Sequence, residues 1–382
     1  MSLARLRLAR TEGVGPITYR RLLARFTTPE AALEALPGLA ASGGRAGLAV
    51  AGAEAARQEM ARVRQAGGQL LFLDDPGYPP MLAMREDAPP AIGVFGDAAL
   101  LSQRSVAIVG SRNASANGRR IAEMLATELA QAGFHVVSGL ARGIDAAAHE
   151  GALRSGPSGG RTIACIAGGF DLPYPAENAA LQARIAAEGA VLAEAPLGTA
   201  PQARHFPRRN RIIAGLAMGV VVVEAALRSG SLITARLALE ANRDVFAVPG
   251  SPLDPRNLGS NALLRQGAHF TETAEDVLEA LRQGIARAEL FGAEPLAVGT
   301  VGFSEPPGEV DTAAEIPEID RVRAHTEILG LLGPAPTAVD DLIRRCQFSA
   351  GAVMSVLLDL ELAGRVESLP GHRFALLADP GT

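Results

Sequence analysis

The sequence contains no lysine, so arginine supplies all 36 of its basic side chains. This absence excludes a Walker-type phosphate loop, which requires a lysine, and it excludes enzymes that hold a cofactor or substrate as a lysine Schiff base. Aromatic residues make up only 4% of the 382 residues, which argues against an extended surface of stacking rings. Any stacking on a nucleobase must therefore depend on very few side chains.

Cysteines and long apolar runs are also scarce. Cys165 and Cys346 lie far apart in apolar patterns typical of a core, which favours a reducing compartment. The longest apolar stretch, Ile212 to Val223, is too short to cross a bilayer. The opening MSLARLRLAR lacks the continuous apolar region of a signal peptide and is better interpreted as an amphipathic helix. We therefore expect a cytoplasmic protein.

Positive charge is concentrated in one segment of a chain that is acidic overall. The formal net charge is -5, so only a local basic cluster would hold a polyanion. Such a cluster lies between Arg204 and Arg211, where Arg208 and Arg209 also occur. Histidines with the spacing of metal ligands and a Gly-x-Ser-x-Gly nucleophile motif are both absent from the sequence. We therefore predict no metal, no cofactor and no hydrolytic machinery.

Composition divides the chain into five segments. Short helices broken by glycine and proline predict a small helical domain of the SAM-like or helix-hairpin-helix type over residues 1–67. The Pro- and Gly-rich segment 68–104 is interpreted as a linker packed on the core, and 105–285 as a Rossmann-like domain. Residues 286–320 lack periodicity and are interpreted as a flexible linker. Three helical patterns and a hairpin pattern predict a winged-helix domain over 321–382.

The central segment has the pattern of a doubly wound, mainly parallel α/β sheet, because short apolar runs alternate with helical patterns. In such a sheet, ligands bind beyond the carboxyl ends of the strands. Six runs are predicted to be strands: Val106 to Val109, His135 to Ser138, Thr162 to Ala167, Val191 to Glu194, Val220 to Glu224 and Val245 to Val248.

Loops rich in glycine, hydroxyl groups and arginine follow these strands. Gly110-Ser111-Arg112 follows the first strand, and Arg112 stands where a dinucleotide fingerprint requires glycine. Backbone N–H groups at the next helix, a hydroxyl and a guanidinium together suit a phosphate. One such loop is explained as well by a tight turn and a surface charge. Other strands are followed by Arg142, by the basic segment Arg204 to Arg211, and by Ser229 to Thr234. We therefore predict an anion-binding crevice at the carboxyl edge of the sheet.

Both terminal domains contain a motif that occurs in DNA-binding proteins. The hairpin Gly13-Val14-Gly15 offers backbone N–H groups to a phosphate, although the same spacing serves tight helix packing, which we favour. The helical pattern Ser349 to Leu362 occupies the place of a recognition helix. It contains no arginine and ends with Asp359 and Glu361, which suits a major groove poorly. We therefore expect this helix to contact a partner instead of reading a DNA sequence.

Several ordered motifs in the central domain resemble the bacterial DNA-processing protein A (DprA, or Smf) family. They are VAIVGSRNASANG (106–118), VSGLARGIDAAAH (137–149), GGFDLPYPAEN (168–178), FPRRNRIIAGL (206–216) and SGSLITA (229–235). The resemblance implies a non-enzymatic protein that binds single-stranded DNA in natural transformation. It also implies loading of the RecA recombinase on that DNA, and a homodimer formed through the Rossmann-like domain.

Carried over by motif, the resemblance places a DNA pocket at Arg112 and at Phe206 to Arg211. Arginines neutralise backbone phosphates without reading sequence, and Phe206 is expected to stack on a base, with burial as a packing residue the alternative. Some of the arginines are expected to brace the fold instead. The residues predicted to bind DNA are Gly110, Ser111, Arg112, Arg142, Arg204, Phe206, Arg208, Arg209, Asn210, Arg211, Ser229, Gly230, Ser231 and Thr234.

Two other functions remain open. A Rossmann-like crevice with these loops also suits a nucleotide-binding enzyme such as a nucleotide phosphoribohydrolase, which would need a catalytic acid such as Glu194 or Glu224. Asp145 and His149 are spaced for a hydrogen bond on one helix, and we favour a structural pair over a catalytic dyad. Alternatively, the chain is chiefly a protein-interaction scaffold built on its terminal helical domains.

Overall fold

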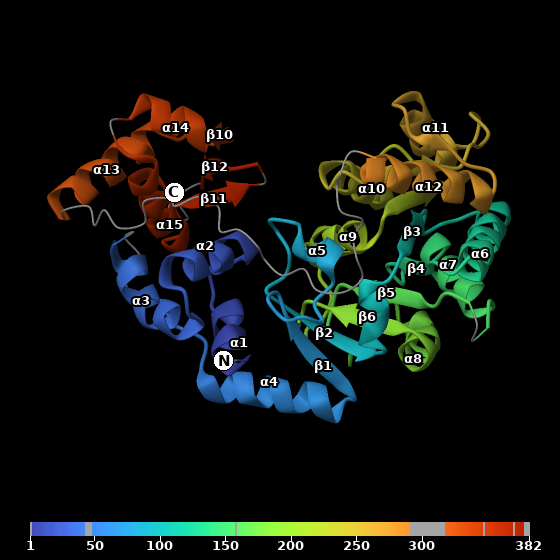
Figure 1. Ribbon diagram of the computed structural model, residues 1–382, viewed down its shortest axis with the longest axis horizontal. Helices are drawn as coiled ribbons and strands as arrows, with labels where there is room; N and C mark the ends of the chain where they lie inside the picture. The colour runs from blue at the N-terminus through green and yellow to red at the C-terminus, as the bar shows by residue number, and fades with distance from the viewer. Residues whose placement is uncertain are drawn as a thin grey trace. The chain divides into compact units, whose positions relative to one another are not determined.

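The computed structural model describes residues 2–42, 48–156, 159–290, 318–346, 348–369 and 371–377. The chain forms two compact units. One unit combines the two ends of the chain, residues 1–58 and 302–382, with the short segment 89–91. The other unit contains residues 59–88 and 92–301 (Figure 1).

A nine-stranded sheet in the order β1-β2-β6-β5-β4-β3-β7-β8-β9 forms the centre of the second unit. The pairs from β6 through to β9 are parallel, whereas β2 pairs with β6 in the antiparallel direction. The strands are β1 (Gly68–Phe72), β2 (Ala91–Gly96), β3 (Ser105–Gly110), β4 (His135–Ser138), β5 (Thr162–Ile166), β6 (Ala190–Ala193), β7 (Gly219–Val223), β8 (Asp244–Ala247) and β9 (His269–Phe270). All six predicted strands are confirmed, with ends shifted by at most one residue.

Helices cover both faces of this sheet, as the apolar runs predict (Figure 1). Val106 and Ile108 face a core that includes α6 (Ala116–Gln131), α7 (Ile144–Leu153) and α12 (Ala274–Leu290). Their neighbours Ala107 and Val109 face the opposite core. That core includes α5 (Pro80–Ala83), α9 (His205–Leu216), α10 (Gly230–Glu240) and α11 (Leu258–Arg265), while α8 (Ala179–Glu188) packs beside β5 and β6. The predicted doubly wound, mainly parallel fold is therefore confirmed.

The segment 68–104, interpreted above as a linker, contributes two strands to this sheet. β1 and β2 extend the sheet beyond β6, and Ile92 and Val94 are completely buried in the core. The short apolar runs between prolines concealed these strands, because each strand is short and flanked by turn residues. The flexible linker predicted over 286–320 lies mainly outside the described residues.

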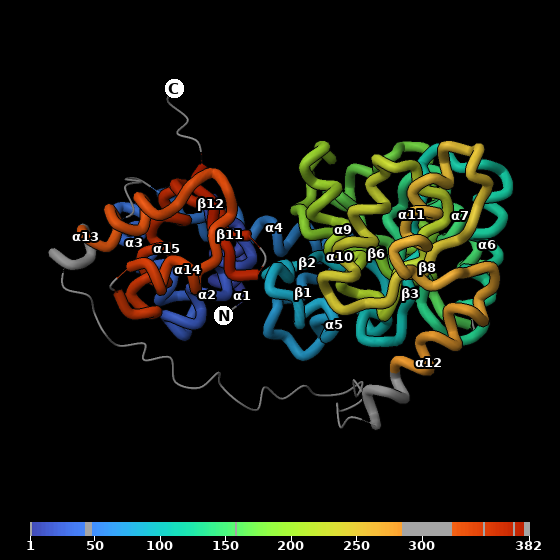
Figure 2. The backbone as a smooth tube through the Cα atoms, turned by 90° about the horizontal axis from the view of Figure 1, so that it is seen from above, coloured from blue at the N-terminus to red at the C-terminus, as the bar shows by residue number. Residues whose placement is uncertain are grey.

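The first unit contains the helices of both chain ends (Figure 2). The N-terminal part consists of α1 (Ser2–Arg10), α2 (Pro16–Phe26) and α3 (Pro29–Ser42), and α4 (Ala53–Gln65) follows. The C-terminal part has the predicted winged-helix order: α13 (Glu318–Leu331), β10 (Thr337–Ala338), α14 (Val339–Arg345), α15 (Ala350–Leu362), β11 (Val366–Leu369) and β12 (Arg373–Leu376). Among the described residues, no helix is long and apolar enough to cross a membrane.

Candidate functional site

One arginine and two aromatic side chains from three different loops meet at the carboxyl edge of the sheet. Arg112, in the loop after β3, is exposed, and its guanidinium carbon lies 4.7 Å from the centre of the Phe206 ring. Phe206 lies in the first turn of α9. The ring of Tyr174, in the loop after β5, meets Phe206 edge-on with the ring centres 5.7 Å apart. The convergence expected of a parallel sheet thus brings a cation and two rings together.

Two cavities include residues of this arrangement in their walls. The first, of about 580 Å³, includes Tyr174, Leu172 and Arg142 in its wall. The second, of about 510 Å³, includes the loops 109–113 and 228–231. The residues shared by both walls are Arg112, Asn113, Ala141, Phe206 and Arg209. The pair Arg112 and Phe206 therefore forms part of both cavities, each large enough for a nucleotide-sized ligand.

Most of the residues predicted from sequence lie in these cavity walls. Arg142 lines the first cavity, where its side chain pairs with Glu177 at 2.8 Å. The second cavity is lined by Gly110, Ser111, Arg112, Phe206, Arg209, Asn210, Ser229, Gly230, Ser231 and Thr234. Sequence reasoning left Tyr174 and Arg228 out of the set although both stand in loops that it singled out, directly after a strand. Because both residues lie in loops that follow strands, their positions could have indicated that they belong to the site.

The basic segment separates into exposed and buried arginines once it is folded as α9. Arg204 and Arg208 are exposed at the start of the helix, outside both cavity walls. Arg211 is 7% exposed, and its guanidinium pairs with Glu194 at 2.6 Å and donates to the Asp87 carbonyl. Arg211 therefore braces the fold, as was expected of some of these arginines, and its guanidinium is not available to a phosphate. A count of charges does not distinguish the faces of a helix.

Arg209 forms a buried, charged base beneath both cavities. Its Nη1 donates to the Cys165 carbonyl at 3.1 Å, and a Cβ at Gly139 would lie 1.4 Å from the same nitrogen, so a side chain at position 139 would displace the guanidinium. Burial lowers the pKa of Arg209, opposed by the carboxylate of Asp145. Burial likewise raises the pKa of Asp145, opposed by Arg209. The two buried charges thus compensate each other.

His149 does not pair with Asp145 as its spacing suggests. Its Nδ1 lies 2.7 Å from the Thr162 hydroxyl, whereas Asp145 accepts an N–H from Ala141 at 3.4 Å. Burial lowers the pKa of His149 to about 3. His149 is therefore a neutral core residue, in agreement with the structural role favoured above, although its partner is on β5.

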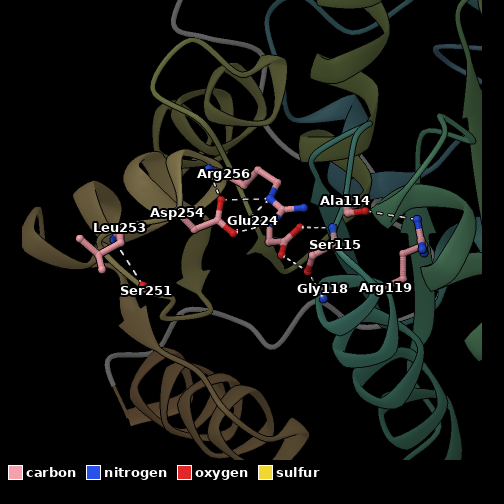
Figure 3. Close-up of polar contacts among 9 residues, drawn as sticks. All are labelled: Ala114, Ser115, Gly118, Arg119, Glu224, Ser251, Leu253, Asp254 and Arg256. Atoms are coloured by element: carbon pink, nitrogen blue, oxygen red, sulfur yellow. Dashed lines mark hydrogen bonds and ion pairs between the residues drawn. The ribbon is translucent and has the colours of Figure 1, made fainter.

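A carboxylate from another loop lies at the start of α6. Glu224 directly follows β7, is 7% exposed and has a φ of 53°, a strained value for a side chain of this kind. It accepts the Ser115 N–H at 2.8 Å and the Ser115 hydroxyl proton, while Ser115 caps the Gly118 N–H at 2.9 Å (Figure 3). A Cβ at Gly118 would lie 2.5 Å from this carboxyl group.

This cap occupies part of the helix start that was expected to offer N–H groups to a phosphate. Glu224 accepts the Ser115 N–H and Ser115 caps the Gly118 N–H, so these two groups are already paired. Arg112 and Asn113 remain exposed in the loop that Glu224 holds. No sequence pattern indicates that an acid after β7 reaches the start of α6, because its positive φ depends on the folded environment.

The chain matches the family model described as DNA recombination-mediator protein A over residues 69–282. This is more than half of the chain. The chain belongs to the DNA recombination-mediator protein A family. Its ends match the DprA-like N-terminal HHH domain over residues 1–61 and the DprA winged helix domain over 312–372. These matches confirm the family, and the class of both terminal domains, that the sequence motifs indicate.

Members of this family with curated sequences or solved structures cover much of the chain. Protein Smf of Escherichia coli is 39% identical, with 81% of this chain and 78% of that protein covered. The DNA processing protein DprA of Bacillus subtilis is 44% identical over 58% of this chain and 74% of its own length. The Streptococcus pneumoniae DprA structure has a TM-score of 0.61 and 34% identity, covering 72% of this chain and 95% of that one.

A second solved relative carries information on a ligand. It is a DNA processing protein A from Helicobacter pylori whose description names a single-stranded DNA binding mode. Its TM-score is 0.51 and its identity 30%, with 57% of this chain and 98% of that chain covered.

Proposed function

We propose that this chain binds single-stranded DNA at the two cavities and protects it during natural transformation without making or breaking a bond. The observation that supports this most directly is the exposed guanidinium of Arg112 on the Phe206 ring, shared by both cavity walls. A cation beside an aromatic ring suits a phosphate followed by a base. The Helicobacter pylori relative that binds single-stranded DNA supports the same ligand.

The positions of the charges favour a strand that crosses both cavities. Arg228 is exposed in the wall of the second cavity, and Arg204 and Arg208 are exposed at the start of α9. We propose that these three arginines, together with Arg112, neutralise phosphates, while Phe206 and Tyr174 stack on bases. Hydroxyl and N–H groups of Ser229 to Ser231 would supply further contacts to the backbone.

The alternative function, a nucleotide-binding enzyme, is less well supported, because both of its candidate catalytic acids are engaged in other contacts. Glu194 is paired with Arg211, and Glu224 caps Ser115. Among the residues of the two cavity walls, Asp145 is the one carboxylate, and it faces the positive charge of Arg209. A group already engaged in this way is poorly placed to transfer a proton to a substrate.

A salt titration with oligo-dT tests the proposal. Arg112→Ala should weaken binding and make the dependence of log affinity on log salt shallower by about 0.7. Phe206→Leu should weaken binding by about 1–3 kcal/mol without changing that slope, because a stacked ring is lost and no charge is removed. Arg282→Ala, on α12, is the matched control and should leave both quantities unchanged. Unchanged affinity in Arg112→Ala and Phe206→Leu would refute this site.

We also propose, from the family resemblance, that the bound strand is delivered to RecA. RecA assembly on oligo-dT, followed by its ATP hydrolysis, should begin earlier when this protein is present. Arg112→Ala should remove the effect at concentrations where it no longer binds the strand. An equal acceleration by that variant would separate RecA loading from the proposed DNA site.

We further propose a homodimer through the second unit, formed at the β9 edge of the sheet. β9 is the last strand of the sheet in the described part of the chain, an edge strand presents backbone groups to a second chain, and Phe270 is 57% exposed. Light scattering of Phe270→Glu should give the mass of a monomer if this edge is the interface. A variant that keeps the mass of a dimer would place the interface elsewhere.

A further inference from the structure

Helix α15 occupies the position of the recognition helix in the winged-helix domain. In helix-turn-helix proteins this helix enters the major groove and presents basic or amide side chains to the bases. Residues 350–362 of α15 include neither arginine nor an amide side chain. The surface of this helix therefore has the wrong chemistry for a nucleic acid, which raises the question of what it contacts.

The C-terminal half of α15 completes the apolar core of the N-terminal helices. Leu358 and Leu362 are 3% and 0% exposed and belong to the same cluster as Leu8, Tyr19 and Leu22. Within this unit, α15 packs against both α2 and α3, as both views of the backbone show (Figures 1 and 2). Two leucines from the far end of the sequence thus fill a core that α1 to α3 alone leave incomplete.

Polar contacts between α2 and α15 fix the orientation of α15 on the N-terminal helices. Arg21 of α2 pairs with Glu361 at 3.2 Å, and the two side chains are only 14% and 13% exposed. The Arg21 guanidinium also lies 4.8 Å from the ring centre of Phe374 on β12. Arg25, one turn later, donates to the Ser355 hydroxyl at 3.1 Å. A shielded ion pair is costly if either partner is lost, so it favours one arrangement of the two helices over others.

The pKa of Glu361 shows that protein groups, and not water, surround its carboxyl group. Burial raises the pKa of this carboxyl group, and the charge of Arg21 and a hydrogen bond from Thr18 oppose that rise. Thr18 and Arg21 both belong to α2. The N-terminal helices therefore provide the groups that keep a buried acid of the winged helix satisfied.

We propose that α15 is a docking helix whose partner is the N-terminal helical domain of the same chain. The winged-helix domain then joins the two ends of the protein into one unit, and its recognition helix is occupied by protein instead of DNA. The occupant is identified by the Leu358 and Leu362 core contacts, the Arg21 and Glu361 pair, and the Arg25 and Ser355 hydrogen bond. This inference is independent of the function proposed for the second unit.

A short cross-link across the contact tests this docking in the full chain. Because the Arg25 side chain spans more than a disulfide can, the double variant Arg25→Cys/Ser355→Cys is treated with a short bis-maleimide, which should give an intramolecular link in the monomer, identified by mass spectrometry of the linked peptides. Arg57→Cys/Ser355→Cys is the matched control and should link much less, because Arg57 is on α4 and α15 packs mainly on α2 and α3. The buried Cys165 and Cys346 serve as internal controls for non-specific cross-linking. Absence of a link, or a link between two chains only, would overturn docking within one chain.

Charge reversal provides a second test that does not depend on a new bond. Arg21→Glu and Glu361→Arg should each increase hydrogen exchange of the α2 and α15 amides at least tenfold in the full chain. The double variant Arg21→Glu/Glu361→Arg should recover most of the protection, which simple misfolding of a single variant would not allow. Protection of α15 amides that instead appears only on addition of duplex DNA would contradict the proposal.

Discussion

Arginines three positions apart in α9 have different roles, because a helix turns one toward solvent and the other toward the core. Arg208 is exposed at the start of the helix, whereas Arg211 is buried against Glu194. Arg208→Ala should therefore reduce the salt dependence of DNA binding with little effect on stability. Arg211→Ala should lower the free energy of unfolding by about 1–3 kcal/mol, since Glu194 loses its partner.

Urea unfolding and oligo-dT titration of the two variants measure these effects side by side. Each variant removes one positive charge, so each is the control for the other. A reduced salt slope in Arg211→Ala, at unchanged stability, would show that the buried position assigned to this guanidinium is wrong.

Glu224 acts on the site through the loop that it holds, and it is a positioning residue. Its carboxylate accepts two hydrogen bonds from Ser115, three residues after Arg112. Glu224→Ala should cost about 1.5–3 kcal/mol of stability for the lost charged hydrogen bonds. It should also weaken oligo-dT binding even though it removes a negative charge. Glu240→Ala, at an exposed position, removes the same charge and should not weaken binding. Equal affinity of the two variants would exclude the positioning role.

At the scale of elements, a buried histidine couples the packing of α7 on β5 to pH. The pKa of His149 is lowered from 6.5 to about 3 by burial, and that of His135 on β4 is lowered by burial and by Arg161. The unfolded chain therefore binds more protons below pH 6.5 than the folded chain does. The stability contributed by neutral His149 is complete above pH 6.5 and is lost toward pH 3, at up to about 1.4 kcal/mol per pH unit.

Urea midpoints at pH 7.5 and 5.0, followed by circular dichroism, check this prediction. The parent protein should lose about 2 kcal/mol more than His149→Gln over this interval, since only the parent must protonate a buried imidazole on unfolding. Glutamine keeps a group able to hydrogen-bond to Thr162. Parallel losses in the two proteins would mean that His149 does not contribute to acid sensitivity.

At the scale of the whole molecule, the two chain ends share one apolar core. Leu362 is completely buried among residues of α1 to α3. Leu362→Ala should therefore destabilise the terminal unit by about 2–5 kcal/mol through lost contacts and a cavity. Leu239→Ala, at a leucine that is 57% exposed on α10, should have little effect.

Hydrogen exchange resolved by peptide locates this effect. Leu362→Ala should accelerate exchange in α2, α3 and α15 together while leaving β3 and β7 protected. Acceleration confined to the winged-helix peptides would indicate that the N-terminal helices are stable without α15.

The family, the doubly wound sheet and the sheet edge that carries the candidate site were all predictable from the amino-acid pattern. Buried strands leave continuous apolar runs, parallel strands end at one edge, and the Gly-Ser-Arg and Phe-Pro-Arg motifs stand directly after such strands. The winged helix was predictable for the same reason, since its helices and hairpin have local periodicities. Strands β1 and β2 were missed because they are short and flanked by turn residues, Gly67 before β1 and Pro90 before β2, so their sheet partners and not their own pattern establish them.

Which side chains of the site face solvent, and which residues the two chain ends contact, became clear from the folded chain alone. Arg211 turned inward to Glu194, Glu224 reached the start of α6, and α15 filled the core of the N-terminal helices. Each of these contacts joins residues far apart in the sequence or depends on a strained backbone angle. Sequence periodicity reports the environment of one element at a time, whereas such contacts arise from how elements pack together.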